Sequence, residues 1–130
     1  MMKTILIGLA LAATLLAGDI RSRGSLVGRV ESDGTVRLRG SIVGKFESGG
    51  SIRVKGSLAG HIESGGHIRK GGSLVGRVES DGTVRSNGSI VGKIESDGTV
   101  RKNGSIVGSV EGVAKELAAV VFFWGFFDVP

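Results

Sequence analysis

The chain has 130 residues, of which 24 are glycine and one is proline, and its 17 basic and 12 acidic side chains give a net charge of +5. Cysteine is absent, which excludes disulfides, zinc sites built from thiolates and cysteine nucleophiles. Basic and acidic residues are interleaved along the chain, and the repeated part holds one aromatic residue, Phe46, so we expect no nucleic-acid-binding surface.

The N-terminal residues have the pattern of a secretory signal peptide. Lys3 gives a short basic start, an uncharged apolar stretch follows, and the small residues Ala17 and Gly18 precede Asp19. The apolar stretch is shorter than the roughly 20 residues of a membrane-spanning helix. We therefore expect residues 1–18 to be a cleaved signal peptide and residues 19–23 to be a linker. The mature protein is expected in the periplasm, in the outer envelope or secreted, with an uncleaved membrane anchor as the alternative.

Residues 24–112 are predicted to form one domain made of a 16-residue repeat. The first unit reads GSLVGRVESDGTVRLR, the fifth reads GSIVGKIESDGTVRKN, and the sixth departs after GSIVGSVEG. Ser, Gly, Glu and Arg recur in fixed columns, so each unit occupies the same environment and makes the same contacts with its neighbours. The units begin, without insertions, at Gly24, Gly40, Gly56, Gly72, Gly88 and Gly104.

Each unit is predicted to be a β-hairpin, which makes the protein all-β. Residues 26–30 form a short run rich in β-branched side chains, residues 31–34 have turn chemistry, and residues 35–37 form a second strand. Asp tolerates turn conformations and Gly supplies a positive φ, so Ser-Asp-Gly indicates a type I turn closed by a bulge. The turn glycines followed by Thr are Gly34, Gly82 and Gly98.

A second column of glycines lies inside the first strand of every unit. Such a glycine marks a bulge, a bend or a close backbone approach, and its recurrence predicts the same approach in each unit. Both residues before it are apolar, so the pattern leaves open which of them faces inward. It also leaves open whether the units close into a ring or stack as an open β-helix or solenoid. The column comprises Gly28, Gly44, Gly60, Gly76, Gly92 and Gly108.

Residues 113–130 form an apolar C-terminal segment. After a short stretch suited to a turn of helix, residues 118–127 read AAVVFFWGFF, which as an extended strand spans about 33 Å at about 3.3 Å per residue. A strand that is apolar on both faces requires burial on both faces. We expect the segment to plug or cap the core of the repeats, with a membrane-surface or oligomer contact as the alternative. Its aromatic residues are Phe122, Phe123, Trp124, Phe126 and Phe127.

The repeat SIVGKIESDGTVR, the leader and the terminal VAKELAAVVFF together resemble the 5-fold β-flower proteins, which are small exported bacterial proteins. The resemblance covers residues 24–127 and implies five to six hairpins around a pseudo-five-fold axis. It implies no activity. A weaker resemblance to the right-handed β-helix of bactofilins rests on the spacing of Gly and apolar residues.

The repeated charges have one geometric implication. The Arg column follows the Glu column by six residues across the turn, so we expect each Glu to pair with its Arg or to be solvated. His61 and His67 are also six residues apart, but no neighbouring unit offers a third ligand, and we expect them to be surface residues. Identical units give identical environments, which argues against paired carboxylates with split pKa values. We therefore predict no catalytic, metal or cofactor-binding residues.

These features favour a non-enzymatic structural or binding protein of the bacterial cell envelope. Its repeated outer faces would bind a multivalent partner, such as an envelope glycan or another envelope protein. The alternative is a membrane-associated protein that self-assembles into homo-oligomers through its Phe-rich C-terminal segment.

Overall fold

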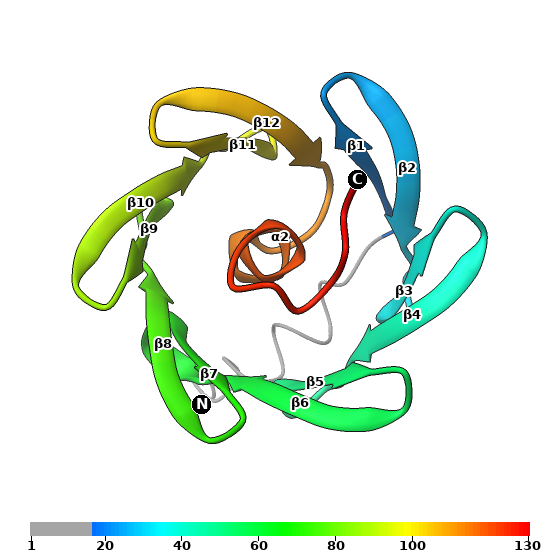
Figure 1. Cartoon of the computed structure of the whole chain (residues 1–130), viewed down its shortest axis with the longest axis horizontal. Coiled ribbons are helices and arrows are strands. Elements are labelled where there is room, and N and C mark those ends of the chain that lie inside the picture. Colours follow the sequence, from blue (N-terminus) through cyan, green and yellow to red (C-terminus); the bar gives the residue numbers. More distant parts are fainter. Residues whose placement is uncertain (1–16) are drawn as a thin grey trace, which may run out of the picture.

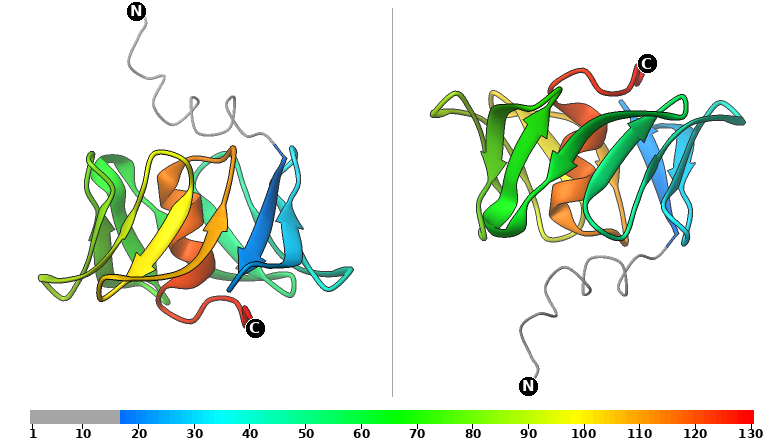
Figure 2. Two further views of the ribbon diagram at one scale, coloured as in Figure 1. Left: turned by 90° about the horizontal axis from the view of Figure 1, so that it is seen from above. Right: turned by 90° about the horizontal axis from the view of Figure 1, so that it is seen from below.

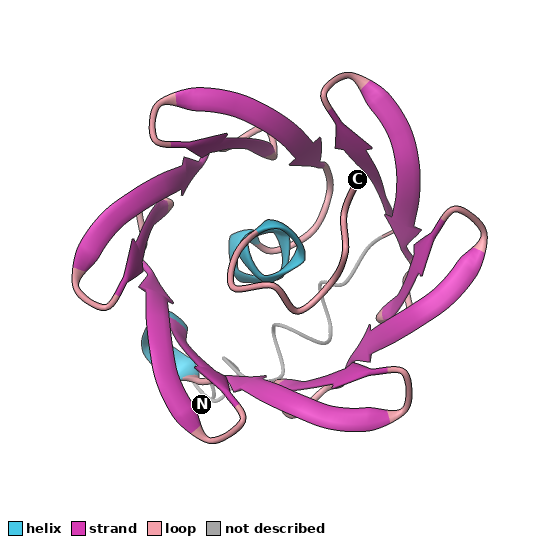
Figure 3. Ribbon diagram, viewed as in Figure 1, coloured by secondary structure: helices cyan, strands magenta, loops and turns pink. Residues whose placement is uncertain are grey.

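A computed structural model describes residues 17–130 of the protein. These residues form twelve antiparallel strands, which close into one barrel because β1 pairs with β12 as well as with β2. Viewed down the barrel, the strands surround helix α2, which lies at the centre (Figures 1 and 3). The predicted signal peptide lies outside the described residues, apart from its last two positions.

The strands of the first half are β1 (Gly18–Ser22), β2 (Ser25–Val30), β3 (Thr35–Leu38), β4 (Ser41–Phe46), β5 (Ser51–Val54) and β6 (Ser57–Ile62). The second half contains β7 (His67–Lys70), β8 (Ser73–Val78), β9 (Thr83–Ser86), β10 (Ser89–Ile94), β11 (Thr99–Lys102) and β12 (Ser105–Val110). A single turn of 3-10 helix, Ser64–Gly66, precedes β7, and α2 comprises Lys115–Phe122.

The all-β prediction is confirmed, and so is the regular repeat of hairpins. The twelve described strands make six hairpins around the helix, so the expected five-fold arrangement is not confirmed. The pairing is antiparallel throughout the described residues, which also removes the β-helix or solenoid alternative.

Two kinds of turn alternate around the barrel and lie at opposite ends of it. The predicted turns, which read Glu-Ser-Asp-Gly or Glu-Ser-Gly-Gly, join β2 to β3 and its equivalents. Two-residue turns such as Asn87-Gly88 join β9 to β10 and its equivalents, and there both residues have positive φ, 51° and 85°. This is the type I′ geometry that suits hairpins, and Asn-Gly is its preferred sequence. We call the hairpin ends around these two-residue turns the tips. They flare outward at the end of the barrel where the C-terminus lies (Figure 2).

The barrel closes because β1 completes the sixth unit. Residues 19–23 were expected to be a linker, and this expectation is wrong, since Gly18–Ser22 is a strand. Ile20 pairs with Val110, and the Arg23 N–H donates to the carbonyl of Val107, as the Arg39 N–H donates to Val27 one unit along. β1 therefore stands beside β12 as β3 stands beside β2. The first described strand therefore completes the unit that β12 begins, and this pairing closes the ring.

A β-bulge in every long strand explains why alternation fails in the repeat. In β4, Ile42 faces Arg37 and Gly44 faces Val36, which leaves Val43 as the extra residue. Ile42 is consequently exposed, whereas Val43 is half-buried and packs against the core. The equivalent Leu or Ile is exposed in the other five units as well.

The core is built from two inward-facing residues per unit around α2. Val36 and Val30 are each 0% exposed, and their equivalents in the other units are buried. Inside this ring, residues 117–121 of α2 are buried on every side, as expected of a helix that is apolar all round.

The C-terminal segment was considered as an extended strand from residue 118, but residues 118–122 are helical. A lone strand inside the closed barrel would have no partner for its backbone N–H and C=O groups. A helix satisfies these groups internally, so helix is the favoured form of a buried apolar segment without a neighbouring strand.

Candidate functional site

The glycines inside the long strands receive the aromatic rings of the C-terminal segment. A Cβ added at Gly76 would lie 2.5 Å from the ring of Trp124 and 2.3 Å from the carbonyl oxygen of Arg85. Gly92 and Gly108 make the same approach to Phe123 and Phe122, at 2.5 Å each. Only a residue without a side chain leaves room for the ring and the neighbouring strand together.

The five aromatic residues use five successive glycines in the reverse order of the chain. Phe122, Phe123, Trp124, Phe126 and Phe127 lie against Gly108, Gly92, Gly76, Gly60 and Gly44, respectively. At the sixth position, Gly28, the side chain of Leu38 takes the place of an aromatic ring. The segment therefore runs around the inside of the barrel and contacts one unit per aromatic residue.

Two residues with positive φ and two lysines fix the position of the aromatic segment that follows α2. Trp124 and Gly125 have positive φ, 66° and 70°, and turn the chain after α2. Lys70 donates from Nζ to the carbonyl oxygen of Trp124 at 2.6 Å and lies 5.3 Å from the ring centre of Phe126. Lys102 covers Phe123 in the same way at 5.1 Å. Both contacts are cation–π interactions at the tip end of the barrel.

The chain end is also tied to this end of the barrel. The hydroxyl of Ser22, which is buried beside the first tip, donates to the carbonyl oxygen of Pro130. The ring of Phe127 meets Phe46 edge-on, with ring centres 6.0 Å apart. Phe123, Phe126 and Phe127 are 5–7% exposed, so the greater part of the aromatic surface is inside the monomer.

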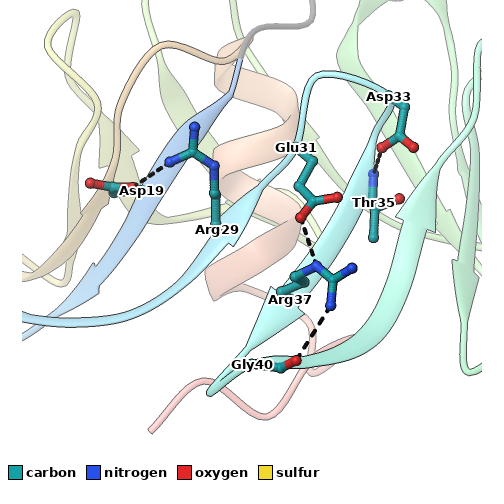
Figure 4. A network of polar contacts seen from close by, with 7 residues as sticks. All are labelled: Asp19, Arg29, Glu31, Asp33, Thr35, Arg37 and Gly40. Carbon is teal, nitrogen blue, oxygen red and sulfur yellow. Dashed lines mark hydrogen bonds and ion pairs between the residues drawn. The ribbon is translucent and has the colours of Figure 1, made fainter.

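The predicted pairing of the Glu and Arg columns is confirmed. Arg37 Nε donates to Glu31 at 2.6 Å, and its Nη1 reaches the carbonyl oxygen of Gly40 at 3.4 Å (Figure 4). One arginine therefore connects the turn at one end of β3 to the turn at its other end. In the described residues the same arrangement recurs in Arg53–Glu47, Arg69–Glu63, Arg85–Glu79 and Arg101–Glu95.

The turn aspartates form a second repeated polar contact. Asp33 accepts a hydrogen bond from the backbone N–H of Thr35 at 2.9 Å, and Asp81 and Asp97 do the same with Thr83 and Thr99 (Figure 4). These N–H groups, helped by the threonine hydroxyls, lower the pKa of each of the three carboxyls. Gly34 follows Asp33 with a φ of 94°, and a Cβ there would meet the carbonyl oxygen of Phe46 at 2.0 Å. Gly82 and Gly98 occupy equivalent positions.

The outer surface carries one aliphatic side chain per tip. Each lies two residues after a two-residue turn and faces the arginine of the neighbouring strand, as Ile42 faces Arg37. Their exposed fractions lie between 49% and 62%. This column is Leu or Ile in all six units, and the exposed Ser that precedes it is equally constant. The six residues are Leu26, Ile42, Leu58, Leu74, Ile90 and Ile106.

The two histidines do not come together in a ligand set. His61 on β6 faces Arg69, and His67 on β7 faces Arg77. Within residues 17–130, no group of three or more His, Asp or Glu side chains is arranged to hold a metal ion. In the same part of the chain, no helix combines the length and apolarity needed to cross a bilayer.

Two shallow depressions are present on the described surface. One of about 300 Å³ lies between the turns containing Asp81 and Glu95, near Lys115. The other, of about 280 Å³, lies at the tip end between Lys102, Asn103 and Trp124. The indole Nε1 of Trp124 is buried and has no hydrogen-bond partner within the described structure.

Sequence reasoning missed the separation of charge along the barrel. Basic and acidic residues alternate in the sequence, but the two kinds of turn differ in charge and lie at opposite ends of the barrel. The Glu-Ser-Asp-Gly turns gather carboxylates at one end, and Arg23, Arg39 and Lys55 lie in the tips at the other. The dipeptides Asn87-Gly88 and Asn103-Gly104 were the available indication of the second kind of turn.

No family model, curated protein or solved structure matches this chain. The closed ring of hairpins is compatible with a repeat β-protein, while the resemblance to the β-flower proteins rests on the repeat, the leader and the C-terminal segment of the sequence.

Proposed function

We propose that the protein is an exported, non-enzymatic binding module of the bacterial cell envelope. In this proposal its six tips contact a partner that offers many equivalent binding points. The observation that carries the proposal is the column of six exposed Leu and Ile side chains, one at each tip. Export is supported by the leader pattern of the sequence.

The exposed column is consistent with selection for binding. No contact within the described monomer buries these side chains beyond about half, yet an aliphatic residue stands at every tip. Single exposed aliphatic residues are common, but a ring of six equivalent ones is a feature of interaction surfaces. Burying the exposed half of one Leu gives roughly 1 kcal/mol, so several tips acting together suffice for stable binding.

Self-assembly through the Phe-rich segment receives less support. Residues 122–127 lie against the glycines of the barrel, and three of the five aromatic rings are nearly fully buried. Exposing them to a second molecule would empty the glycine positions that they occupy. The tips, in contrast, are available without any rearrangement.

The proposal is tested by retention on isolated envelope material, separated into membrane and wall fractions. The wild-type protein is compared with variants in which two, four or six of the Leu and Ile column are replaced by Thr, which retains strand propensity. Multivalent binding predicts retention that falls steeply with each pair of substitutions. If the wild-type protein is retained on neither fraction, the proposal is contradicted. It is also contradicted if the six-fold variant is retained as well as the wild type.

A further inference from the structure

The tip end of the barrel combines exposed aliphatic side chains with positive charge. Arg23, Arg39 and Lys55 are the exposed first residues of three two-residue turns. In each of these three hairpins the exposed Leu or Ile stands three residues later. Charge and apolar surface therefore lie together in the same tips.

Two further cations stand at the opening between the tips. Lys70 and Lys102 lie over the rings of Phe126 and Phe123, where their apolar stems cover the aromatic segment. Asp128, in the C-terminal segment that lies at this end (Figure 2), is the one acidic side chain among residues 124–130. The half-buried Phe122 and Trp124 belong to the same region.

The opposite end carries most of the carboxylates and is polar. Its turns carry Asp33, Asp81, Asp97 and the Glu column, of which five members are paired with arginines of the described chain. The molecule therefore presents a basic, partly apolar face at the tips, whereas the other end carries carboxylates together with the basic side chains of Lys45, Arg77 and Lys93. Lysine and arginine beside leucine, isoleucine and tryptophan are the composition of protein surfaces that lie on anionic membranes.

We propose that the tip end binds the surface of a bilayer that contains anionic lipids. The basic residues contact the headgroups, and the Leu and Ile column enters the interfacial layer. This inference rests on the proposed function, since it names the partner of the same tips. The charge complementarity favours this occupant over a neutral glycan, because five cations at one end have no role in binding an uncharged polymer.

The tips themselves supply a matched variant. Asn87 and Asn103 occupy the same turn position in two other units, so Arg23→Asn, Arg39→Asn and Lys55→Asn together keep the turn geometry while removing three charges. The control variant is Lys45→Ser, Arg77→Ser and Lys93→Ser. It removes three charges from a strand column away from the tips, in which the last unit has Ser109.

The measurement is sedimentation with vesicles of phosphatidylglycerol and phosphatidylcholine, and with vesicles of phosphatidylcholine alone. The purified protein is used with its N-terminus established by mass spectrometry, and all variants share that N-terminus. We expect binding to the anionic vesicles alone, weakened by salt. The tip variant is expected to bind roughly a hundredfold more weakly, at about 1 kcal/mol per basic residue, and the control variant to bind nearly as well as the wild type.

The outcomes separate this inference from the function on which it rests. Equal binding to both kinds of vesicle, equal weakening by the tip and control variants, or absence of binding overturns the lipid inference. If the protein fails to bind vesicles but is retained on the wall fraction, and the six-fold Thr variant is not, a wall polymer is the partner and the binding function stands. If the protein binds neither the vesicles nor either envelope fraction, both the lipid inference and the proposed binding function are overturned.

Discussion

The ring of Phe127 packs against Gly44 so closely that a Cβ added at Gly44 would lie 2.6 Å from a ring carbon. This relationship connects the last residues of the chain to the second of six units. It recurs with the other aromatic residues, so that the repeats and the C-terminal segment have complementary shapes. The repeats supply a ring with six gaps, and the segment fills five of them.

Replacing Gly76 by Ala tests this complementarity. The added methyl group would meet the Arg85 carbonyl oxygen and the Trp124 ring, both within 2.5 Å. Overpacking of this kind costs about 1–3 kcal/mol of the free energy of unfolding. The control is Gly49→Ala, because a Cβ at Gly49 meets nothing within 4 Å. Urea denaturation that shows equal stability for the two variants would mean that the gap at Gly76 is not required.

Replacing Leu117 by Ala tests the helix as part of the core. Leu117 is 0% exposed at the centre of the barrel, so we expect a loss of about 2–5 kcal/mol in the free energy of unfolding. Ile106→Ala removes a similar side chain from a tip, where Ile106 is 59% exposed, and should change stability by about 0.5 kcal/mol or less. The two variants are compared by thermal and urea denaturation. A Leu117 variant as stable as the Ile106 variant would show that α2 is not packed inside.

The paired Glu79 and Arg85 are expected to interact weakly. Their side chains are 29% and 37% exposed, and ion pairs at such positions contribute about 0.2–1 kcal/mol. A double-mutant cycle with Glu79→Gln and Arg85→Gln measures the coupling free energy directly. We expect a coupling in this range that decreases with added salt, because salt screens partly exposed charges. A coupling unchanged by salt would contradict an electrostatic origin.

The turn aspartates predict a pH dependence of stability. Hydrogen bonds from Thr35, Thr83 and Thr99 lower the pKa of Asp33, Asp81 and Asp97 below the ordinary value of 3.8. The ionised carboxylates therefore favour the folded state. Their contribution is present above about pH 4 and is lost as the pH falls through the lowered pKa values.

A triple Asp→Asn variant at these three positions isolates the effect, since Asn retains an accepting side-chain oxygen but does not titrate. Its melting temperature should fall less than that of the wild type as the pH is lowered from about 5 to about 2. Melting curves measured across this range test the difference. Parallel loss of stability in the two proteins would exclude a contribution from these aspartates.

The local structure of each unit was predictable from sequence because its determinants are local. The Asp33 carboxylate accepts from the backbone N–H of Thr35 and Gly34 adopts a positive φ, so the Glu-Ser-Asp-Gly turn follows from the local residue types. The Glu–Arg pairs followed from the spacing across this turn. The orientation of Ile42 and Val43 did not, because a bulge changes the alternation without changing the pattern of apolar residues.

The arrangement of the units depends on contacts between distant parts of the chain, and sequence patterns do not encode these directly. Five or six hairpins satisfy the same repeat, and the pairing of Ile20 with Val110 decides the number by closing the ring. The helical form of residues 118–122 likewise depends on the surrounding barrel, which deprives the segment of a strand partner. The difference in charge between the two ends of the barrel can be predicted only after each kind of turn has been assigned to its end.

The central claim is that the C-terminal segment fills the barrel of the monomer rather than contacting a partner. Deletion of residues 113–130 tests it most directly, with far-UV circular dichroism and sedimentation velocity on the wild-type and shortened chains. We predict a folded wild-type monomer and a shortened chain that loses its β-sheet spectrum or aggregates, because the ring of inward-facing Val and Ile side chains is left unfilled. A shortened chain that stays a folded monomer with the wild-type spectrum would contradict the account.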